Sequence, residues 1–174
     1  MKKFSYLFFV FFLATSCSKE PQSNVQLQDL VDNISVQKLG QRLIDLPFGL
    51  NKLEPTLEEA EEIFIGIHGG SSEGYEWVYP LKTINTEKKE MYFYRWPDNG
   101  CFQDSADQLS TSINSILKLR PALTKVTLMG HSYGGILVSH ALKNWSNKTP
   151  FEAHIVASPL LGTTMLNNLC NYSP

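Results

Sequence analysis

The stretch VTLMGHSYGGILVSHAL, residues 126–142, contains an abrupt change of pattern. An apolar run stops at Gly130, a short turn containing Ser132 follows, and apolar residues resume after Gly135 with a different spacing. The run KVTLMG, residues 125–130, predicts a buried strand, and GILVSHALKNW, residues 135–145, predicts a helix. We therefore expect Ser132 to lie on a tight turn between that strand and that helix.

The flanking segments continue the alternation of strands and helices. Apolar runs that end in glycine or proline predict buried strands in EIFIGIHGG (62–70), EMYFYRWPDNG (90–100) and FEAHIVASP (151–159). Between the first two strands, residues 73–84 predict a helix that Pro80 interrupts.

A second helix is predicted by an amphipathic stripe. Its apolar residues follow helical spacing, and they are Leu109, Ile113, Ile116 and Leu117. We expect Asp104 to cap its amino end and Pro121 to end it.

The order β-α-β-α-β-α-β over residues 62–159 defines the fold class. Strands that are apolar on both faces and joined by helices predict an α/β fold, a mostly parallel sheet with helices on both faces. The preceding segment is less clear. LGQRLIDLPFGL, residues 39–50, fits an edge strand or a covering loop, and PTLEEAEE, residues 55–62, fits a short polar helix.

In a parallel α/β sheet, ligands bind at the carboxyl ends of the strands, where Ser132 is expected. Gly130 and Gly134 have no Cβ, so strand and helix can approach closely around a sharp turn that exposes the serine hydroxyl. The free N–H of Tyr133, at the amino end of the helix, can stabilise a developing oxyanion.

The sequence Gly130-His131-Ser132-Tyr133-Gly134, in this context, resembles the nucleophile elbow of the α/β-hydrolase family, particularly its lipase-like and esterase-like members. The resemblance implies that Ser132 attacks a carboxylic ester, with lipid esters among the candidate substrates, without a metal or cofactor. A peptidase or thioesterase would use the same elbow, so those activities stay open.

HGGSS, residues 68–72, is similar to the family's oxyanion loop. The resemblance assigns the second backbone donor of the oxyanion hole to Gly70 or, alternatively, to Ser71. A separate resemblance concerns IVASPLLGT, residues 155–163, where Leu160 and Leu161 fit either an acyl pocket or the core.

The acid and base of a catalytic triad are not found. In the family they follow the serine in the chain, but after Ser132 the sequence offers only Glu152, His140 and His154. His140 is expected roughly 12 Å along the helix from the serine, because each helical residue adds about 1.5 Å. Glu152 and His154 are expected toward the amino end of their strand.

The two remaining histidines, His68 and His131, fit structural roles beside the elbow. The resemblance covers residues 62–163 and lacks the later strand–helix units of the family, so we expect a partial α/β-hydrolase fold with impaired catalysis. Such a chain is either a truncated product or a reduced protein that uses the scaffold without turnover. The alternative function is a non-catalytic, hydrolase-like surface lipoprotein that binds a lipid or a partner.

The first residues predict export. Lys2 and Lys3 precede an apolar run, residues 4–14, that is shorter than the about 20 residues needed to span a bilayer. We interpret residues 1–16 as a signal peptide. LATSC resembles a bacterial lipobox, which implies lipidation of Cys17, a lipid-anchored tether at residues 17–24 and a domain at residues 25–174 in the cell envelope. A plain signal peptide with an incidental Cys17 is the alternative.

Composition sets the remaining bounds. The chain has 174 residues, 43% of them hydrophobic, which suffices for one globular core. A formal net charge of −2 with no basic run argues against nucleic-acid binding. No metal-ligand spacing is present, and Cys101 and Cys170 could be either paired or free.

Overall fold

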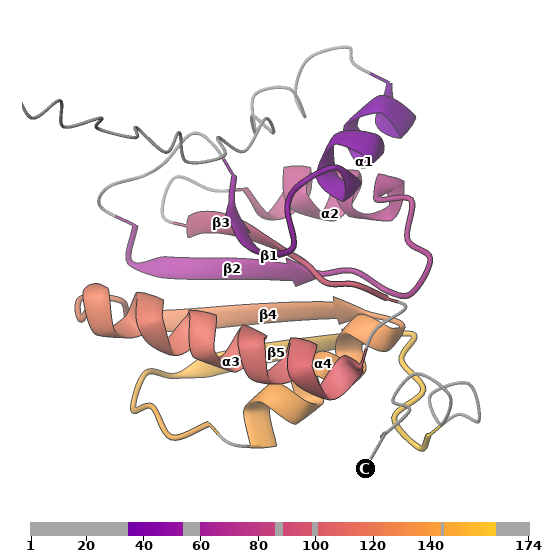
Figure 1. The fold of residues 1–174 in the computed structure, drawn as a ribbon. Coiled ribbons are helices and arrows are strands. Elements are labelled where there is room, and N and C mark those ends of the chain that lie inside the picture. Colours follow the sequence, from indigo (N-terminus) through magenta and orange to yellow (C-terminus); the bar gives the residue numbers. More distant parts are fainter. Residues whose placement is uncertain (1–34, 54–59, 86–88, 99–100, 144, 163–174) are drawn as a thin grey trace, which may run out of the picture.

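Five strands form one sheet in the order β1-β3-β2-β4-β5 (Figure 1). The structure, a computed structural model, describes residues 35–53, 60–85, 89–98, 101–143 and 145–162. β1 runs antiparallel to β3, and the other neighbouring pairs are parallel. The strands are β1 (Gly49–Lys52), β2 (Glu62–Ile67), β3 (Lys89–Arg95), β4 (Lys125–His131) and β5 (Phe151–Val156).

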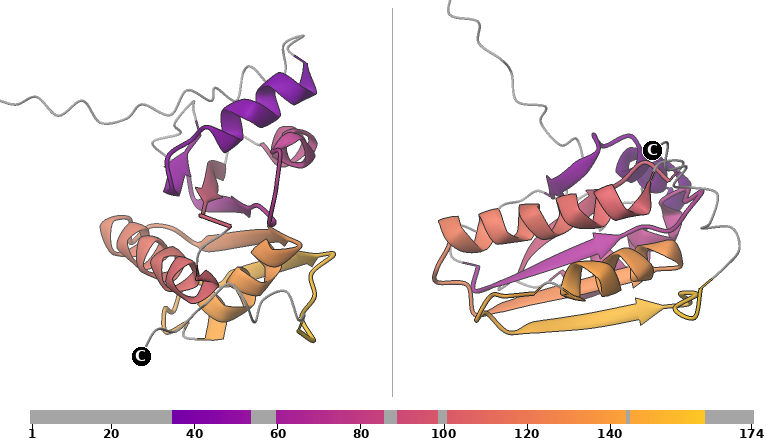
Figure 2. Two further views of the ribbon diagram at one scale, coloured as in Figure 1. Left: turned by 45° about the vertical axis from the view of Figure 1, so that its right-hand side comes forward. Right: turned by 60° about the horizontal axis from the view of Figure 1, so that its bottom comes forward.

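Helices cover the sheet from both sides, so the predicted α/β class with a mostly parallel sheet is confirmed. Figure 2 shows α1 and α2 on one face and α3 and α4 on the other. The chain crosses from β2 to β3 in one direction and from β3 to β4 in the opposite direction, and right-handed crossovers then place α2 and α3 on opposite faces. The helices are α1 (Val36–Ile44), α2 (Tyr75–Ile84), α3 (Phe102–Leu119) and α4 (Tyr133–Lys143).

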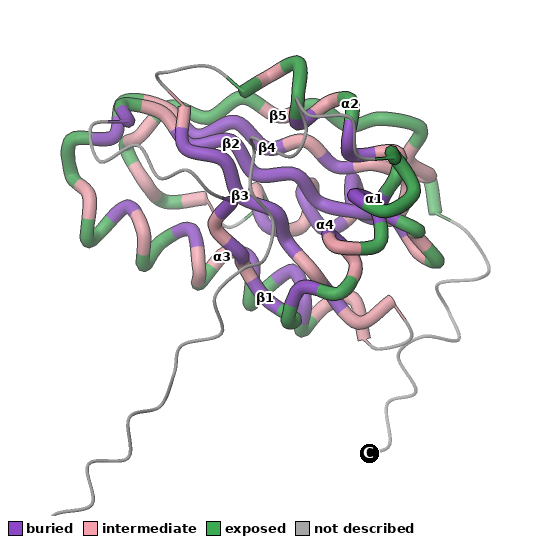
Figure 3. The backbone as a smooth tube through the Cα atoms, turned by 90° about the horizontal axis from the view of Figure 1, so that it is seen from above, coloured by how far each residue is buried: buried purple, intermediate pink, exposed green. Residues whose placement is uncertain are grey.

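The central strands are buried on both faces, as their apolar runs predicted (Figure 3). Ile63, Ile65 and Ile67 of β2 pack toward α3 and α4, while Phe64 packs with Trp77 toward α1 and α2. Two apolar layers therefore hold the sheet in place, which fixes the positions of the loops at its carboxyl edge.

Two helix predictions need correction. α2 runs without a break through Pro80, because Trp77, Val78 and Leu81 around it are buried and hold the helix on the sheet. α3 begins at Phe102 with Cys101 at the N-cap, so the predicted capping by Asp104 is wrong. Asp104 lies instead in the first helical turn, where a carboxylate still complements the helix dipole.

Three other predictions have clear outcomes. α3 ends at Leu119, before Pro121, as expected. Residues 39–44 belong to α1 rather than to a strand or loop, because their apolar stripe packs against α2, and the edge strand β1 begins only at Gly49. The predicted polar helix falls mostly on residues 54–59, which lie outside the described residues.

Predictions for the chain's ends also lie outside the described residues. They concern the signal peptide, Cys17, the tether and Cys170. Cys101 is disulfide-bonded. No helix in the described part of the chain has the length and apolar character to cross a membrane.

Candidate functional site

The topology places a crevice at the carboxyl ends of β2 and β4. These strands are neighbours, with Ile67 paired to Gly130, but the chain leaves β2 toward one side of the sheet and β4 toward the other. Such a reversal of direction separates the two following loops and is where open α/β sheets bind ligands. The loop after β2, residues 68–74, and the turn at Ser132 therefore emerge side by side.

Ser132 occupies a strained turn. Its φ angle is 52°, in the left-handed region that residues with a side chain rarely adopt. The turn is fixed at both sides: the Ser132 N–H donates to Val156 O at 2.9 Å, and the Ser132 carbonyl accepts from Gly135 N–H at 3.1 Å. This is the backbone predicted for a serine whose hydroxyl is exposed between β4 and α4.

The glycines around Ser132 are required by close backbone contacts. A Cβ at Gly130 would lie 2.5 Å from Gly134 O, and a Cβ at Gly134 would lie 2.3 Å from Ile67 O. Both distances are far below van der Waals contact, so the strand and helix can approach only because these side chains are absent.

The loop after β2 lies directly against the turn. A Cβ at Gly69 would be 2.9 Å from Ser132 Cβ, and one at Gly70 would be 2.8 Å from Tyr133 Cδ2. The loop backbone therefore reaches the serine and the first residue of α4. Tyr133 N–H has no acceptor within its own helix because it opens the first turn.

Of the two candidate donors in this loop, one is already bonded. Ser71 has a φ of 54°, and its N–H donates to the carboxylate of Asp98. For the N–H of Gly70, no acceptor is found among the described residues. The two alternatives left by the sequence thus differ in the structure: the Gly70 N–H is available to a ligand and the Ser71 N–H is bonded to Asp98.

An open pocket of about 230 Å³ lies over Ser132. A smaller apolar pocket of about 80 Å³ adjoins it, shares Glu76 and His131 with it, and is lined also by Trp77, Met129 and Val156. The larger pocket is lined by Gly69, Gly70, Ser71, Ser72, Glu73, Tyr75, Glu76, His131 and Ser132.

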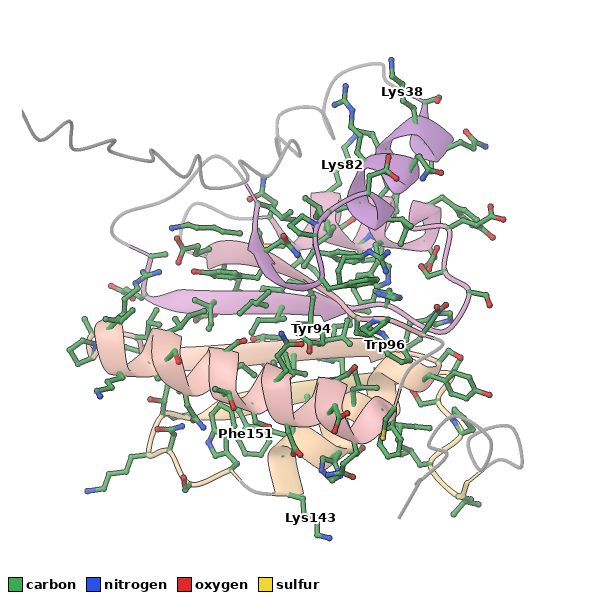
Figure 4. The ribbon with its side chains drawn as sticks, viewed as in Figure 1. Lys38, Lys82, Tyr94, Trp96, Lys143 and Phe151 are labelled. Atoms are coloured by element: carbon green, nitrogen blue, oxygen red, sulfur yellow. The ribbon has the colours of Figure 1, made fainter. Side chains whose placement is uncertain are left out.

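His68 supports the loop after β2. Its ring is buried between Phe93 and Trp96, and Trp96 lies at the carboxyl end of the sheet (Figure 4). His68 Nε2 accepts from the Trp96 N–H at 3.1 Å and from Arg95 at 3.0 Å. Because Nε2 faces two donors, the ring proton sits on Nδ1, which donates to Gly69 O at 2.7 Å.

This hydrogen bond sets the direction of the Gly70 N–H. In a trans peptide, the carbonyl of one residue and the N–H of the next point in opposite directions. Since the Gly69 carbonyl points to the His68 ring, the Gly70 N–H points away from it. The expected structural role of His68 is therefore a specific one, because its ring orients the peptide between the two glycines.

Burial lowers the pKa of His68 from 6.5 to about 4, so the folded protein keeps the ring neutral. Below about pH 6.5 the His68 ring is protonated in the unfolded chain but stays neutral in the folded protein. The free energy of unfolding therefore falls as the pH drops from about 6.5 to about 4. We expect this residue to cost about 3 kcal/mol of unfolding free energy between about pH 7 and pH 4. Denaturant titrations of the wild type and His68→Gln should show a shallower pH dependence in the variant. Parallel pH profiles would contradict the assignment.

The other candidate bases lie away from Ser132, as expected. His140 projects from α4 toward α3, where its ring contacts Gln103, Phe102 and, at 3.5 Å, Asp107. His154, the fourth residue of β5, pairs with Glu152 at 2.9 Å and is exposed. In the described ranges, neither His140 nor His154 lines the pocket over Ser132.

His131 is the histidine that the structure does bring to this pocket. Its side chain lines both cavities, and within the described residues its Nδ1 has no hydrogen-bond partner. A Cβ at Gly69 would lie 3.4 Å from that nitrogen. The sequence placed His131 beside the elbow, but nothing in it indicated that the ring faces the pocket.

Two further residues of the site were not assigned by the sequence. Asp98 accepts a hydrogen bond from the Ser71 N–H, and Arg95 contacts His68. Both come from the end of β3, so only the pairing of β3 with β2 brings them to the loop. Leu160 and Leu161 are exposed, so the core interpretation is wrong for them, and neither lines the two pockets at Ser132.

No group of side chains in the described residues has the arrangement of a metal site. No protein-family model, no curated protein and no solved structure matches this chain.

Proposed function

We propose that this chain is a serine hydrolase of the α/β-hydrolase type, with part of that fold, that acts on a carboxylic ester through Ser132. The observation that carries the proposal is the left-handed backbone of Ser132, with φ 52°, between β4 and α4. A non-glycine residue held there costs roughly 1–3 kcal/mol, and such strain is concentrated at functional sites. The glycine loop that lies against this turn is the second support.

The proposed reaction starts with attack of Ser132 Oγ on the ester carbonyl carbon. The carbonyl oxygen takes the electron pair and becomes an oxyanion, which accepts hydrogen bonds from the N–H groups of Tyr133 and Gly70. We choose Gly70 over Ser71 because the Ser71 N–H is bonded to Asp98. The C–O bond to the alcohol then breaks, the alcohol gains the proton that Ser132 loses, and water later releases the acid.

The amino end of α4 supports the same step. No acidic residue lies in its first turn, so the partial positive charge of the helix end is not neutralised there. A hydrogen bond from one such backbone donor typically contributes about 3 kcal/mol to transition-state stabilisation.

The adjoining apolar pocket favours an ester with an apolar acyl group. Trp77, Met129 and Val156 line it next to Ser132, and a lipid ester fits this chemistry. Export by the segment at residues 1–16 and lipidation at Cys17 would place the enzyme on a membrane of the cell envelope, close to such substrates.

Turnover is expected to be slow. Ser132 is a weak nucleophile without a base. His131 lines its pocket together with Glu73 and Glu76, but within the described residues His131 Nδ1 has no hydrogen-bond partner, so no carboxylate orients it. Backbone donors alone can still accelerate acylation relative to water.

A fluorophosphonate probe and an activated ester test the proposal. We expect slow, stoichiometric labelling of the wild type, abolished in Ser132→Ala and retained in Ser139→Ala, which changes a second serine in the middle of α4. Labelling that persists in Ser132→Ala would refute the proposal. Rapid multiple turnover would show that a base acts at the site.

The second candidate is a non-catalytic surface lipoprotein that binds a lipid or a partner. The apolar pocket beside an unassisted serine is the observation that favours it. Binding of a fluorescent fatty ester with equal affinity to the wild type and Ser132→Ala, without labelling of either, would support this candidate.

A further inference from the structure

β5 forms one edge of the sheet. It pairs with β4 on its inner side, and no strand of the described chain pairs with its outer side (Figure 2). Figure 3 shows the contrast in burial between β5 and the inner strands. Phe151 is 44% exposed and Ile155 is 36% exposed, which is unusual for apolar residues in a strand of a parallel sheet.

The backbone groups on the outer edge can be identified from the inner ladder. Val126 N–H donates to Pro150 O and Ser132 N–H donates to Val156 O, so the even-numbered residues of β5 point toward β4. Because successive residues alternate, the N–H and C=O groups of Phe151, Ala153 and Ile155 point outward. They present a row of donors and acceptors that another strand can bond.

The side chains of β5 also alternate. Glu152 and His154 lie opposite Thr127 and Met129, on the face of α1 and α2, while Phe151 and Ile155 lie on the face of α3 and α4. Lys125 contacts Glu152 from the neighbouring strand, so the carboxylate is already balanced by one cation.

We propose that two copies of this chain form a two-fold dimer in which the β5 strands pair antiparallel, centred on Ala153. Two identical edge strands pair side by side and antiparallel only when the two-fold axis is perpendicular to the sheet. Such an axis keeps each side chain on its own face, so residues facing each other must both be odd or both be even. The proposal does not depend on the chemistry at Ser132.

In pairing centred on Ala153, every residue whose backbone groups point outward has a hydrogen-bonding partner on the other subunit. Phe151 then faces Ile155 of the partner subunit, and Ala153 faces its own copy; these are hydrogen-bonded pairs because their backbone groups point outward. The side chains opposite each other are apolar, and the smallest one lies on the axis.

The other face has complementary polar groups. Glu152 faces His154 of the partner subunit in a non-hydrogen-bonded pair, where opposite side chains come closest. Since each Glu152 also contacts its own His154 at 2.9 Å, carboxylates and imidazoles alternate across the axis.

The neighbouring registers are less favourable. Centring on Glu152 would set two carboxylates opposite each other, and centring on His154 would set Glu152 opposite Val156. The complementarity of both faces therefore selects the register centred on Ala153. The resulting contact is self-complementary, so it closes as a dimer and removes this edge from further pairing.

Three variants of the full chain, each with one added cysteine and purified in a mild detergent, locate the axis. Hydrogen-bonded residues facing each other have Cα atoms about 5.5 Å apart, which is within the range of a disulfide. We expect Ala153→Cys to give a disulfide-linked dimer on a non-reducing gel above the wild-type background. His154→Cys and Ile155→Cys are the matched controls, and neither should, because neither residue faces its own copy.

A charge exchange tests the register in solution. Sedimentation should show a concentration-dependent dimer for the wild type and roughly tenfold weaker association for His154→Glu. In that variant residues 152 and 154 of both subunits place four carboxylates next to one another at the interface. The double variant Glu152→His with His154→Glu should restore association. A monomer at every concentration, cross-linking through residue 154 or 155 in place of 153, or no loss with His154→Glu in a normally folded variant overturns the proposal.

Discussion

Replacing Gly134 with alanine is expected to lower the free energy of unfolding by about 3 kcal/mol. The added Cβ would lie 2.3 Å from Ile67 O and 2.5 Å from His68 O. Both obstacles are backbone atoms of the buried β2 segment, so no side-chain rotation can relieve the contact. The start of α4 must move away from β2, and equilibrium denaturation measures the cost.

The same movement should affect the candidate site. α4 begins at Tyr133, so displacing its first turn moves the Tyr133 N–H away from Gly70. We expect Gly134→Ala to lose fluorophosphonate labelling as well as stability. Ser139→Ala, in the same helix, is the control and should change stability by less than about 0.5 kcal/mol. Equal stabilities of the two variants would mean that the helix and β2 are not in this close contact.

The sequence predicted the strand–turn–helix at Ser132 because its requirements are local. Residues 125–145 contain all of the parts: a strand buried on both faces, two glycines and a helix N-terminus. The same holds for β2 and the glycine loop that follows it. Residues whose partners lie next to them in the chain can be assigned from composition and spacing alone.

The contacts that orient the loop could not be predicted in this way. Asp98 and Arg95 reach the loop only because β3 lies beside β2, and strand order is a long-range property. The choice between Gly70 and Ser71 depends on Asp98, so it stayed open in the sequence. The prediction of a strand or loop for residues 39–44 was wrong. The apolar residues of this segment pack against α2, and that long-range contact is not visible in the local sequence.

A second large effect is expected at Glu90, a carboxylate buried in β3. Its side chain is fully buried and forms ion pairs with Lys52, which belongs to β1, and with Arg120, the C-cap of α3. Tyr92 Oη donates a third contact at 3.0 Å. One carboxylate thus connects the edge strand, a central strand and the end of a helix.

Glu90→Gln is expected to cost about 3 kcal/mol of unfolding free energy. The amide keeps the volume but removes the charge, so Lys52 and Arg120 are left as neighbouring cations without their shared counter-charge. Breaking these pairs is costly because two neighbouring cations then repel each other without the fully buried carboxylate that lies between them. Urea denaturation at neutral pH measures the loss.

Glu62→Gln is the matched control, since Glu62 starts the adjacent strand and pairs with Lys89 at 3.6 Å. Both of those side chains retain more than a quarter of their exposure, at 28% and 27%, so water compensates for the lost pair. We expect a cost below about 1 kcal/mol. If the two glutamine variants were equally stable, burial of the Glu90 network would contribute nothing, and the connection between β1, β3 and α3 would rest on apolar packing alone.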